Sequence, residues 1–198
     1  MRITGGSKRG RRLAAPKKNS FIRPTSDRVR EALFTLLADR VSGSMVLDIF
    51  AGTGSLGIEA LSRGAEAAVF IDHSKEAARL VQTNLLTCFT QPRALFFFLE
   101  LPGATPLTRL AARLPQNTFF DLVFLDPPYR KKMALPVLEQ LRATKILASD
   151  CLIIVEEHQH AQLPDKVADI ELVDHRIYGE TGLWFYAPFS QPGKNTSK

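Results

Sequence analysis

The sequence contains few of the residues on which secreted and metal-binding proteins depend. Only two of its 198 residues are cysteines, Cys88 and Cys151, and they form neither a CxxC pair nor a spacing with histidine that is typical of zinc sites. A disulfide framework and a zinc site are therefore not indicated, and a reducing cytoplasm is the expected location. No stretch approaches the roughly 20 apolar residues of a membrane-spanning helix. Residues 1–15 also lack the apolar segment of a signal peptide, so we expect a soluble monomer that binds no metal.

Histidine and tryptophan are also scarce, with four residues and one residue respectively. His158 and His160 are two positions apart, but no third metal ligand accompanies them, so we expect both on a solvated surface. Trp184 and Phe185 fall in a C-terminal apolar segment. We expect them to pack within an edge hairpin rather than to stack on a nucleobase.

Positive charge is distributed unevenly along the chain. Residues 1–30 carry ten Lys or Arg and one acid, a balance of +9, so that the net charge of +6 leaves −3 for the other 168 residues. A basic segment on a slightly acidic body is typical of proteins that bind a polyanion, and nucleic acid is the leading candidate. A merely solubilising tail is the alternative. The candidates for phosphate contacts are Arg9, Arg11, Arg12, Lys17, Lys18, Arg23 and Arg28.

The most informative stretch joins an apolar run to a glycine-rich turn. Residues 45–50 are apolar except for Asp48, as expected of a central parallel strand that is buried on both faces. The glycines that follow, Gly52, Gly54 and Gly57, allow a tight turn and a close approach of the next helix. Because open α/β sheets bind ligands at the carboxyl ends of their strands, this turn is predicted to cradle a nucleotide-like ligand.

Asp48 narrows the choice of ligand. A glycine turn alone is shared with pyridine-nucleotide and flavin binders, which hold a pyrophosphate at the helix N-terminus. A carboxylate just before the first glycine would repel that group. It suits a ligand that carries a cation, such as S-adenosylmethionine with its ammonium and sulfonium groups. The alternative is that Asp48 only caps the turn.

The order of the predicted elements indicates the fold. Strands and helices alternate through the first five strands, which argues for an α/β protein with a doubly wound, mostly parallel sheet. A short turn at 179–182 joins the last two strands into an antiparallel edge hairpin. The seven expected strands are 45–50, 67–71, 94–99, 119–125, 151–156, 170–178 and 182–187, and the expected helices are 26–40, 54–63, 74–87, 106–114 and 133–143.

Three regions are expected along the chain. Residues 1–40 form a basic nucleic-acid-binding extension that ends in a helix, residues 41–188 form the main domain, and residues 189–198 form a disordered tail. Residues 1–24 are not expected to build a core of their own. Within them, Arg2-Ile3 and Phe21-Ile22 could supply short strands that become ordered only on binding.

A second carboxylate follows the predicted strand 67–71. Asp72 lies 20 residues after Gly52, near the spacing at which an acid at the end of the second strand reaches ribose hydroxyls. We predict that it binds the ribose of the ligand. The alternative is a helix cap for the segment that starts at Ser74.

The most specific motif follows the strand 119–125 and reads Asp126-Pro127-Pro128-Tyr129. Two consecutive prolines fix two φ angles and remove two backbone donors, so the loop offers only acceptors, its carbonyl oxygens and the Asp126 carboxylate. Tyr129 adds a flat aromatic face. Acceptors beside an aromatic ring suit a nucleobase with an exocyclic amine. A proline-rich turn without further function is the alternative.

The expected chemistry follows from that amine. Its lone pair is delocalised into the ring, so it attacks poorly until hydrogen bonds to Asp126 and to the Pro127 carbonyl draw the nitrogen towards tetrahedral geometry. Positioning of the reacting groups is expected to supply most of the acceleration, because it can lower an activation barrier by about 7–11 kcal/mol. Electrostatic stabilisation of the developing ammonium adds to it. The predicted catalytic set is Asp126, Pro127, Pro128 and Tyr129.

These motifs resemble a known family. The combination of Asp48-x-Phe50-x-Gly52-x-Gly54 with the Asp126 to Tyr129 motif is similar to class I S-adenosylmethionine-dependent methyltransferases that modify exocyclic amines. Further blocks, over about residues 1–187, are similar to the RsmD-like family of bacterial guanine-N2 methyltransferases of small-subunit ribosomal RNA. These blocks are Met1-Arg2-Ile3-x-Gly5-Gly6, Arg9-Gly10-Arg11, Arg23-Pro24-Thr25-Ser26-Asp27-Arg28-Val29-Arg30-Glu31, Leu61-Ser62-Arg63-Gly64-Ala65 and Tyr178-Gly179.

The resemblance implies roles for these residues. The turn after the first strand, with Phe50, would line the S-adenosylmethionine site, and the basic N-terminus would bind RNA phosphates. Thr25 and Arg30 would lie near the mouth of the cofactor or base site. The family usually has a Gly-Asp pair after the third strand whose acid contacts the cofactor adenine. Here the region reads Phe98-Leu99-Glu100-Leu101-Pro102-Gly103, so either Glu100 substitutes for that acid or the contact is lost.

The residues leave other functions open. An adenine-N6 methyltransferase of DNA or RNA would use the same acceptor loop, and a catalytically silent RNA-binding assembly factor would keep the same fold. A pyridine-nucleotide oxidoreductase leaves the Asp126 to Tyr129 loop unexplained. The expected partner is small-subunit ribosomal RNA or its assembly particle, with the target nucleotide undetermined.

Overall fold

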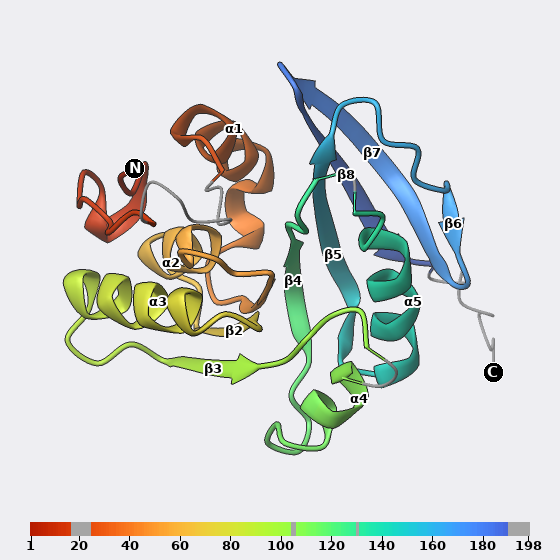
Figure 1. Cartoon of the computed structure of the whole chain (residues 1–198), viewed down its shortest axis with the longest axis horizontal. Coiled ribbons are helices and arrows are strands. Elements are labelled where there is room, and N and C mark those ends of the chain that lie inside the picture. The colour runs from red at the N-terminus through yellow and green to blue at the C-terminus, as the bar shows by residue number, and fades with distance from the viewer. Residues whose placement is uncertain (17–24, 104–105, 130, 190–198) are drawn as a thin grey trace, which may run out of the picture.

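The computed structural model describes residues 1–16, 25–103, 106–129 and 131–189, in which strands and helices alternate (Figure 1). The elements are η1 (Gly6–Lys8), α1 (Asp27–Leu37), η2 (Ala38–Arg40), β1 (Met45–Ile49), α2 (Ser55–Ser62), β2 (Ala67–Asp72), α3 (Lys75–Cys88), β3 (Ala94–Phe98), α4 (Pro106–Ala111), β4 (Phe120–Leu125), α5 (Ala134–Thr144), β5 (Leu147–His158), β6 (Lys166–Val167), β7 (Ile170–Tyr178) and β8 (Thr181–Pro188). The five predicted helices are all present.

The strands form one sheet in the order β3-β2-β1-β4-β5-β8-β7-β6. The first five of these neighbours run parallel, and β8, β7 and β6 are antiparallel, which confirms the predicted mostly parallel α/β sheet with an antiparallel edge hairpin. The prediction of seven strands was wrong by one. The additional strand, β6, pairs only Lys166 with Glu171 and Val167 with Ile170. Two residues are too few to show a strand periodicity in the sequence.

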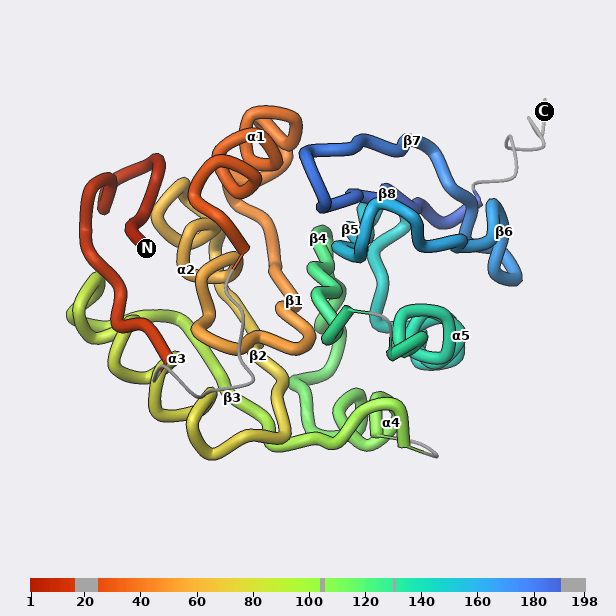
Figure 2. The backbone as a smooth tube through the Cα atoms, turned by 45° about the horizontal axis from the view of Figure 1, so that its top comes forward, coloured from red at the N-terminus to blue at the C-terminus, as the bar shows by residue number. Residues whose placement is uncertain are grey.

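Helices cover both faces of the sheet (Figure 2). Val46 packs on one face with apolar residues of α1, α2 and α3, whereas Leu47 and Ile49 pack on the other with those of α4 and α5. This double burial explains why the strands read as continuous apolar runs. Against such a background Asp48 stands out in the sequence.

The strand order reverses at β1, which pairs with β2 on one side and with β4 on the other. The connections on the two sides of β1 therefore diverge and leave a crevice at the carboxyl ends of the strands. The Asp126 amide, which follows β4, donates to the Ile49 carbonyl at the end of β1 over 3.2 Å. The two predicted motifs are thus brought to the same edge.

The N-terminal segment packs on the main domain. The strand predicted at Arg2-Ile3 is a single antiparallel bridge between Arg2 and Arg12, and its ordering only on binding stays a prediction. Ile3 and Leu13 are buried in the same core cluster as α1 and α2. The strand predicted at Phe21-Ile22 lies outside the described residues.

A buried carboxylate on α2 fastens this segment. Glu59 is fully buried and accepts hydrogen bonds from the Thr4 amide and hydroxyl, both at 2.8 Å, and from the Gly5 amide at 2.7 Å. It also forms ion pairs with Arg30 at 3.2 Å and Arg63 at 2.9 Å. The basic segment is therefore held by charge-assisted hydrogen bonds rather than by apolar contact alone.

Glu59→Gln is expected to lower the free energy of unfolding by about 3–5 kcal/mol, because the substitution leaves the buried Arg30 without its full counter-charge. Urea denaturation followed by circular dichroism measures the change. Glu66→Gln is the matched control, since Glu66 pairs with Arg93 on the exposed surface and such pairs contribute about 1 kcal/mol or less. Equal stability of the two variants would contradict the anchoring role of Glu59.

At the other end of the chain, the Phe189 amide donates a backbone hydrogen bond to the Asp169 carbonyl, so the prediction that residue 189 belongs to a disordered tail was wrong for that residue. Residues 190–198 lie outside the described part of the chain. Among the described ranges, no helix combines the length and apolarity that a membrane crossing requires.

Candidate active site

A cavity of about 430 Å³ opens at the carboxyl ends of β1, β2, β4 and β5. Both motifs predicted from the sequence contribute to its wall. The lining residues are Thr25, Ser26, Asp48, Phe50, Ala51, Gly52, Thr53, Ser55, Leu56, Asp72, His73, Ser74, Glu76, Asp126, Pro127, Pro128, Tyr129, Glu156 and Thr181.

Asp48 is a buried carboxylate at the base of this cavity, with 1% of its surface exposed. Its Oδ2 accepts a 2.9 Å hydrogen bond from the Gly57 amide. A Cβ at residue 57 would come within 2.4 Å of the Phe70 ring, so glycine is required there, as predicted from close helix packing. Burial, together with the nearby charge of Asp72, raises the pKa of Asp48 to about 8 although the Gly57 hydrogen bond opposes the shift. A cation in the cavity would favour the ionised form.

The turn after β1 uses three residues with positive φ, namely Phe50 at 62°, Gly52 at 54° and Gly54 at 74°. Phe50 and Gly52 line the cavity, as predicted. Gly54 is not among the lining residues, and a Cβ there would point to Val81, Ile58 and Phe70 in the core. Its positive φ lets the turn enter α2, and the predicted contact with the cofactor stays a prediction.

Asp72 lies where a ribose ligand is expected, at the end of β2 and in the cavity wall. Its Oδ2 accepts from the Gly52 amide at 3.0 Å and its Oδ1 from the Ser74 amide at 2.9 Å. The hydroxyl of Ser74 caps α3 by accepting from the Glu76 and Ala77 amides. The carboxylate thus ties the glycine turn to the start of α3, and a direct role at the ribose stays a prediction.

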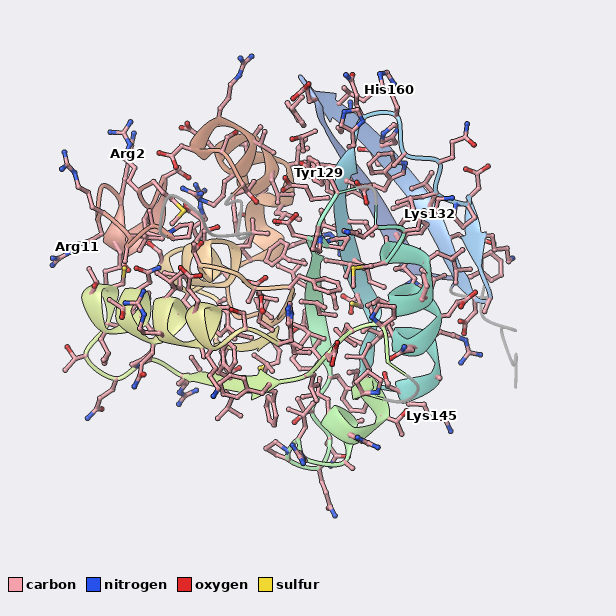
Figure 3. The ribbon with its side chains drawn as sticks, in the orientation of Figure 1. Arg2, Arg11, Tyr129, Lys132, Lys145 and His160 are labelled. Atoms are coloured by element: carbon pink, nitrogen blue, oxygen red, sulfur yellow. The ribbon has the colours of Figure 1, made fainter. Side chains whose placement is uncertain are left out.

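The loop after β4 joins a polar network. The Thr25 hydroxyl lies 3.2 Å from Asp126 Oδ2 and 3.0 Å from Glu156 Oε2. The Tyr129 hydroxyl donates to Glu156 Oε1 at 2.9 Å and lies 3.1 Å from Thr181 Oγ1. Figure 3 shows Tyr129 near the ends of β4 and β5. Three separate parts of the chain, at Thr25, Glu156 and Thr181, therefore surround this loop and its polar groups.

The electrostatics of the network favour a shared proton. Burial raises the pKa of Asp126 well above its usual value, and the charges of Glu156 and Asp48 raise it further. The pKa of Tyr129 is also raised, first by burial and then by Glu156, so its hydroxyl remains a donor. Because Thr25 has one hydroxyl proton for two carboxyl groups, a proton on Asp126 would complete the hydrogen bonds.

Glu156 and Thr181 were not predicted from the sequence. A signal was available for Glu156, since it follows the apolar run 151–155 as Asp48 and Asp126 follow theirs. Thr181 gave no such signal. It reaches the site because β8 pairs antiparallel with β5, which places Thr181 opposite His158 and near the Tyr129 hydroxyl.

Two further residues predicted for the cofactor site are not among those that line the cavity. Arg30, expected near the mouth of the site, is fully buried and bonded to Glu59, Asp27 and the Thr25 and Arg2 carbonyls. It therefore acts on the site by holding Thr25 in place. Glu100, the candidate for the adenine contact, is exposed and is not among the residues that line the cavity.

The described cations of the N-terminal region are mostly on the surface. Arg9, Arg11, Arg12 and Arg28 are exposed, and Figure 3 shows Arg2 and Arg11 projecting outward from the N-terminal segment. Three further predicted phosphate contacts, Lys17, Lys18 and Arg23, lie outside the described residues.

The aromatic and histidine predictions had mixed outcomes. Trp184 and Phe185 are buried in β8, as predicted, and Trp184 stacks on His175 at 4.4 Å. His160 is exposed, but His158 is half-buried, with its ring edge-on to Tyr129 at 6.2 Å. Across the described residues, no group of three or more His, Cys, Asp or Glu side chains is placed to hold a metal ion.

The sheet order and the two loops assign the chain to a class. Doubly wound dinucleotide enzymes hold a pyrophosphate at the turn where this chain has a buried carboxylate, and they have no use for an acceptor-only loop after the fourth strand. The architecture and the site are those of the class I methyltransferases.

Comparison with known proteins identifies the family. Residues 1–187 match the family described as "Conserved hypothetical protein 95". The "Putative rRNA methyltransferase YlbH" of Bacillus subtilis is 36% identical over 94% of this chain and 98% of its own length. The "Ribosomal RNA small subunit methyltransferase D" of Haemophilus influenzae is 39% identical over 90% and 93%. The solved structure of "Putative methyltransferase yhhF from Escherichia coli" is 31% identical over 96% and 99%, with a TM-score of 0.79. The chain belongs to this family, the RsmD-like methyltransferases that its motifs resemble.

Proposed function

We propose that this protein transfers a methyl group from S-adenosylmethionine to the exocyclic N2 amine of a guanine in small-subunit ribosomal RNA. The observation that carries the proposal is that the acceptor loop Asp126 to Tyr129 lines the same cavity as the glycine turn after β1. One cavity therefore offers a site for a cationic methyl donor and a site for an aromatic amine. The relatives named as ribosomal RNA methyltransferases support the choice of RNA.

The residues of the cavity fit the cofactor. Asp48 supplies a buried carboxylate for the positive charge of the cofactor. Asp72, at the end of β2, is assigned to the cofactor ribose, and Gly52 has no side chain to prevent a ligand from approaching the turn closely. When bound, S-adenosylmethionine supplies a methyl group on a sulfonium. Glu100 is not assigned a role here, because it is not among the residues that line the cavity.

The acceptor loop prepares the base for attack. Asp126 Oδ and the Pro127 carbonyl each accept a hydrogen bond from the guanine N2 amine. These two hydrogen bonds reduce the delocalisation of the nitrogen lone pair into the ring and orient it towards the methyl group. After transfer the nitrogen is acidic, and its proton passes to Asp126. Tyr129, held by Glu156 and Thr181, presents its ring face to the base. The chain thus contributes mainly orientation and charge.

The exposed arginines of the N-terminal segment are assigned to the RNA phosphates. Replacing Arg9, Arg11 and Arg12 with Gln is expected to weaken RNA binding and to reduce the slope of log K against log salt by about 2–3, because each phosphate contact contributes about 0.7–0.9 to it. Fluorescence anisotropy at several salt concentrations measures the slope. The control replaces Arg109, Arg113 and Lys145, which are exposed cations beside the other face of the sheet. An unchanged slope in the first variant would show that these arginines do not contact phosphates.

The proposed function is tested with tritiated S-adenosylmethionine and small ribosomal subunits from cells that lack the endogenous enzyme. Nucleoside analysis of the labelled RNA is expected to show N2-methylguanosine. Label in N6-methyladenosine would replace the proposal with an adenine methyltransferase. No label, with cofactor binding intact by calorimetry, would exclude this substrate, and the absence of both would favour a silent assembly factor.

A further inference from the structure

A second cavity lies beside the active site and has no part in the chemistry described above. Its volume is about 710 Å³, within the range of about 300–1,000 Å³ that is usual for small-molecule sites. Three parts of the chain form its wall: the segment before α5, the first turn of α5, and the end of β5 with the loop that follows it. The lining residues include Lys132, Leu135, Pro136, His158, His160 and Leu163.

The two cavities adjoin at the carboxyl ends of β4 and β5. In the loop after β4, Tyr129 lines the first cavity and Lys132 lines the second. Neighbouring residues of a strand point to opposite faces of a sheet, and accordingly Glu156 lines the first cavity and Glu157 the second. An RNA strand with its target base in the first cavity therefore has a neighbouring nucleotide within reach of the second.

Aromatic rings connect the two cavities. The ring centroids of Tyr129 and His158 are 6.2 Å apart, and those of His158 and His160 are 5.3 Å apart. The His160 amide donates a hydrogen bond to His158 Nδ1 over 3.3 Å, which holds the His158 ring in place. His160 is exposed, and Figure 3 shows it on the same side of Tyr129 as Lys132. Such a row of rings is a surface on which successive bases of single-stranded RNA can stack.

The rest of the wall suits the other parts of a nucleotide. Leu135 and Pro136 offer apolar surface to a base, and Lys132 offers an ammonium group to a phosphate. Lys132 has a φ of 54°, in the left-handed region that favours glycine, so the chain keeps a cation there at a conformational cost. Glu157 is buried, and its Oε1 accepts a hydrogen bond from the His158 amide over 2.8 Å. We therefore assign this acid to the support of His158 rather than to the ligand.

We propose that the second cavity binds the nucleotide next to the target guanine, with its base against the rings of His158 and His160 and its phosphate beside Lys132. This inference rests on the proposed function and names a further contact with the same RNA. Enzymes that act on an extruded base set their sequence context through contacts with the flanking nucleotides. The second cavity therefore holds the strand while the acceptor loop holds the guanine.

The test removes the proposed contact from either partner. Small subunits are assembled with RNA in which an abasic residue replaces the nucleotide on one side of the labelled guanine or on the other. For the wild-type protein, one of these two replacements is expected to lower kcat/KM about 5- to 150-fold, the effect of losing one stacked base. His160→Ala is expected to lower kcat/KM for intact RNA and to add little to the loss at that abasic position, because its stacking partner is already absent.

His175→Ala is the matched control, because His175 is exposed, stacks on Trp184 and is not among the residues that line either cavity. It is expected to leave kcat/KM unchanged for every RNA. Lys132→Gln tests the phosphate contact separately. It is expected to reduce the slope of log K against log salt by about 0.7, the contribution of one phosphate of a single strand.

The outcomes separate this inference from the proposed function. If intact subunits are labelled but neither abasic residue lowers kcat/KM, the inference is overturned and the proposed function stands. Values for His160→Ala and Lys132→Gln that equal those of the wild-type protein would also overturn it. Losses from His160→Ala that add fully to those of both abasic residues would overturn it as well, and would assign the cavity to another partner, such as a protein of the subunit. If the wild-type protein labels no guanine in intact subunits, the proposed function fails and this inference fails with it.

Discussion

Asp126→Asn is expected to lower the rate of methyl transfer by about 10²- to 10⁴-fold while S-adenosylmethionine binds with unchanged affinity. The carboxylate accepts a proton of the amine and takes up the proton after transfer, and general bases in such positions contribute about this much. An amide keeps the size of the side chain but can turn a donor towards the amine. Single-turnover kinetics and calorimetry separate the rate from the affinity. Asp165→Asn, on the exposed surface, is the control.

The pH dependence of the same step checks the assignment. Because the pKa of Asp126 is raised by burial and by Glu156 and Asp48, the ionised form that accepts the amine proton increases only as pH rises through that raised pKa. The wild-type rate is therefore expected to increase with pH over a range that lies above the ordinary titration range of an aspartic acid. Retention of the full rate by Asp126→Asn, or a rate that falls over this range, would remove Asp126 from its role.

Asp48→Asn is expected to weaken S-adenosylmethionine binding at least about tenfold, or about 1.4 kcal/mol, and at the same time to stabilise the free protein. The carboxylate that favours a bound cation is costly in the empty cavity, where burial raises its pKa from 3.8 to about 8. The amide oxygen can still accept the hydrogen bond from the Gly57 amide. Calorimetric titration measures the affinity, and thermal denaturation measures the stability.

The stability change has a defined direction with pH. A carboxyl group whose pKa is higher in the folded than in the unfolded state contributes stability below its unfolded value, and this contribution is lost as pH rises through the folded value. The Tm of the wild-type protein is therefore expected to fall between pH 5 and pH 9 more steeply than that of Asp48→Asn. Near pH 9 the variant should melt at least about 2–4 °C higher, corresponding to about 1 kcal/mol. Parallel curves would show that Asp48 is not the group that titrates.

Much of the site could be predicted because its signals are local. The apolar strand that ends at Asp48, the glycines after it and the prolines after Asp126 all act through φ angles and burial patterns of neighbouring residues. The doubly wound sheet order then brings the ends of β1 and β4 together, as expected for any sheet of this type. The cavity that contains both motifs follows from these short-range features.

The outcomes that could not be predicted depend on partners far apart in the chain. Arg30 belongs to a basic run, yet it is buried because Glu59, 29 residues later, faces it. Glu156 reaches Thr25 across 131 positions and Tyr129 across 27. A charge count cannot distinguish such residues from exposed ones, since the pairing is decided only when helices and strands pack.

The sequence by itself therefore determined the class of fold, the glycine turn with its carboxylate and the acceptor loop, because these are properties of contiguous residues. The tertiary structure alone decided which charges are exposed, which acids share the cavity and what fastens the N-terminal segment. The physical reason is that the burial of a charge is favourable only beside a partner, and the partners here come from separate elements of the chain.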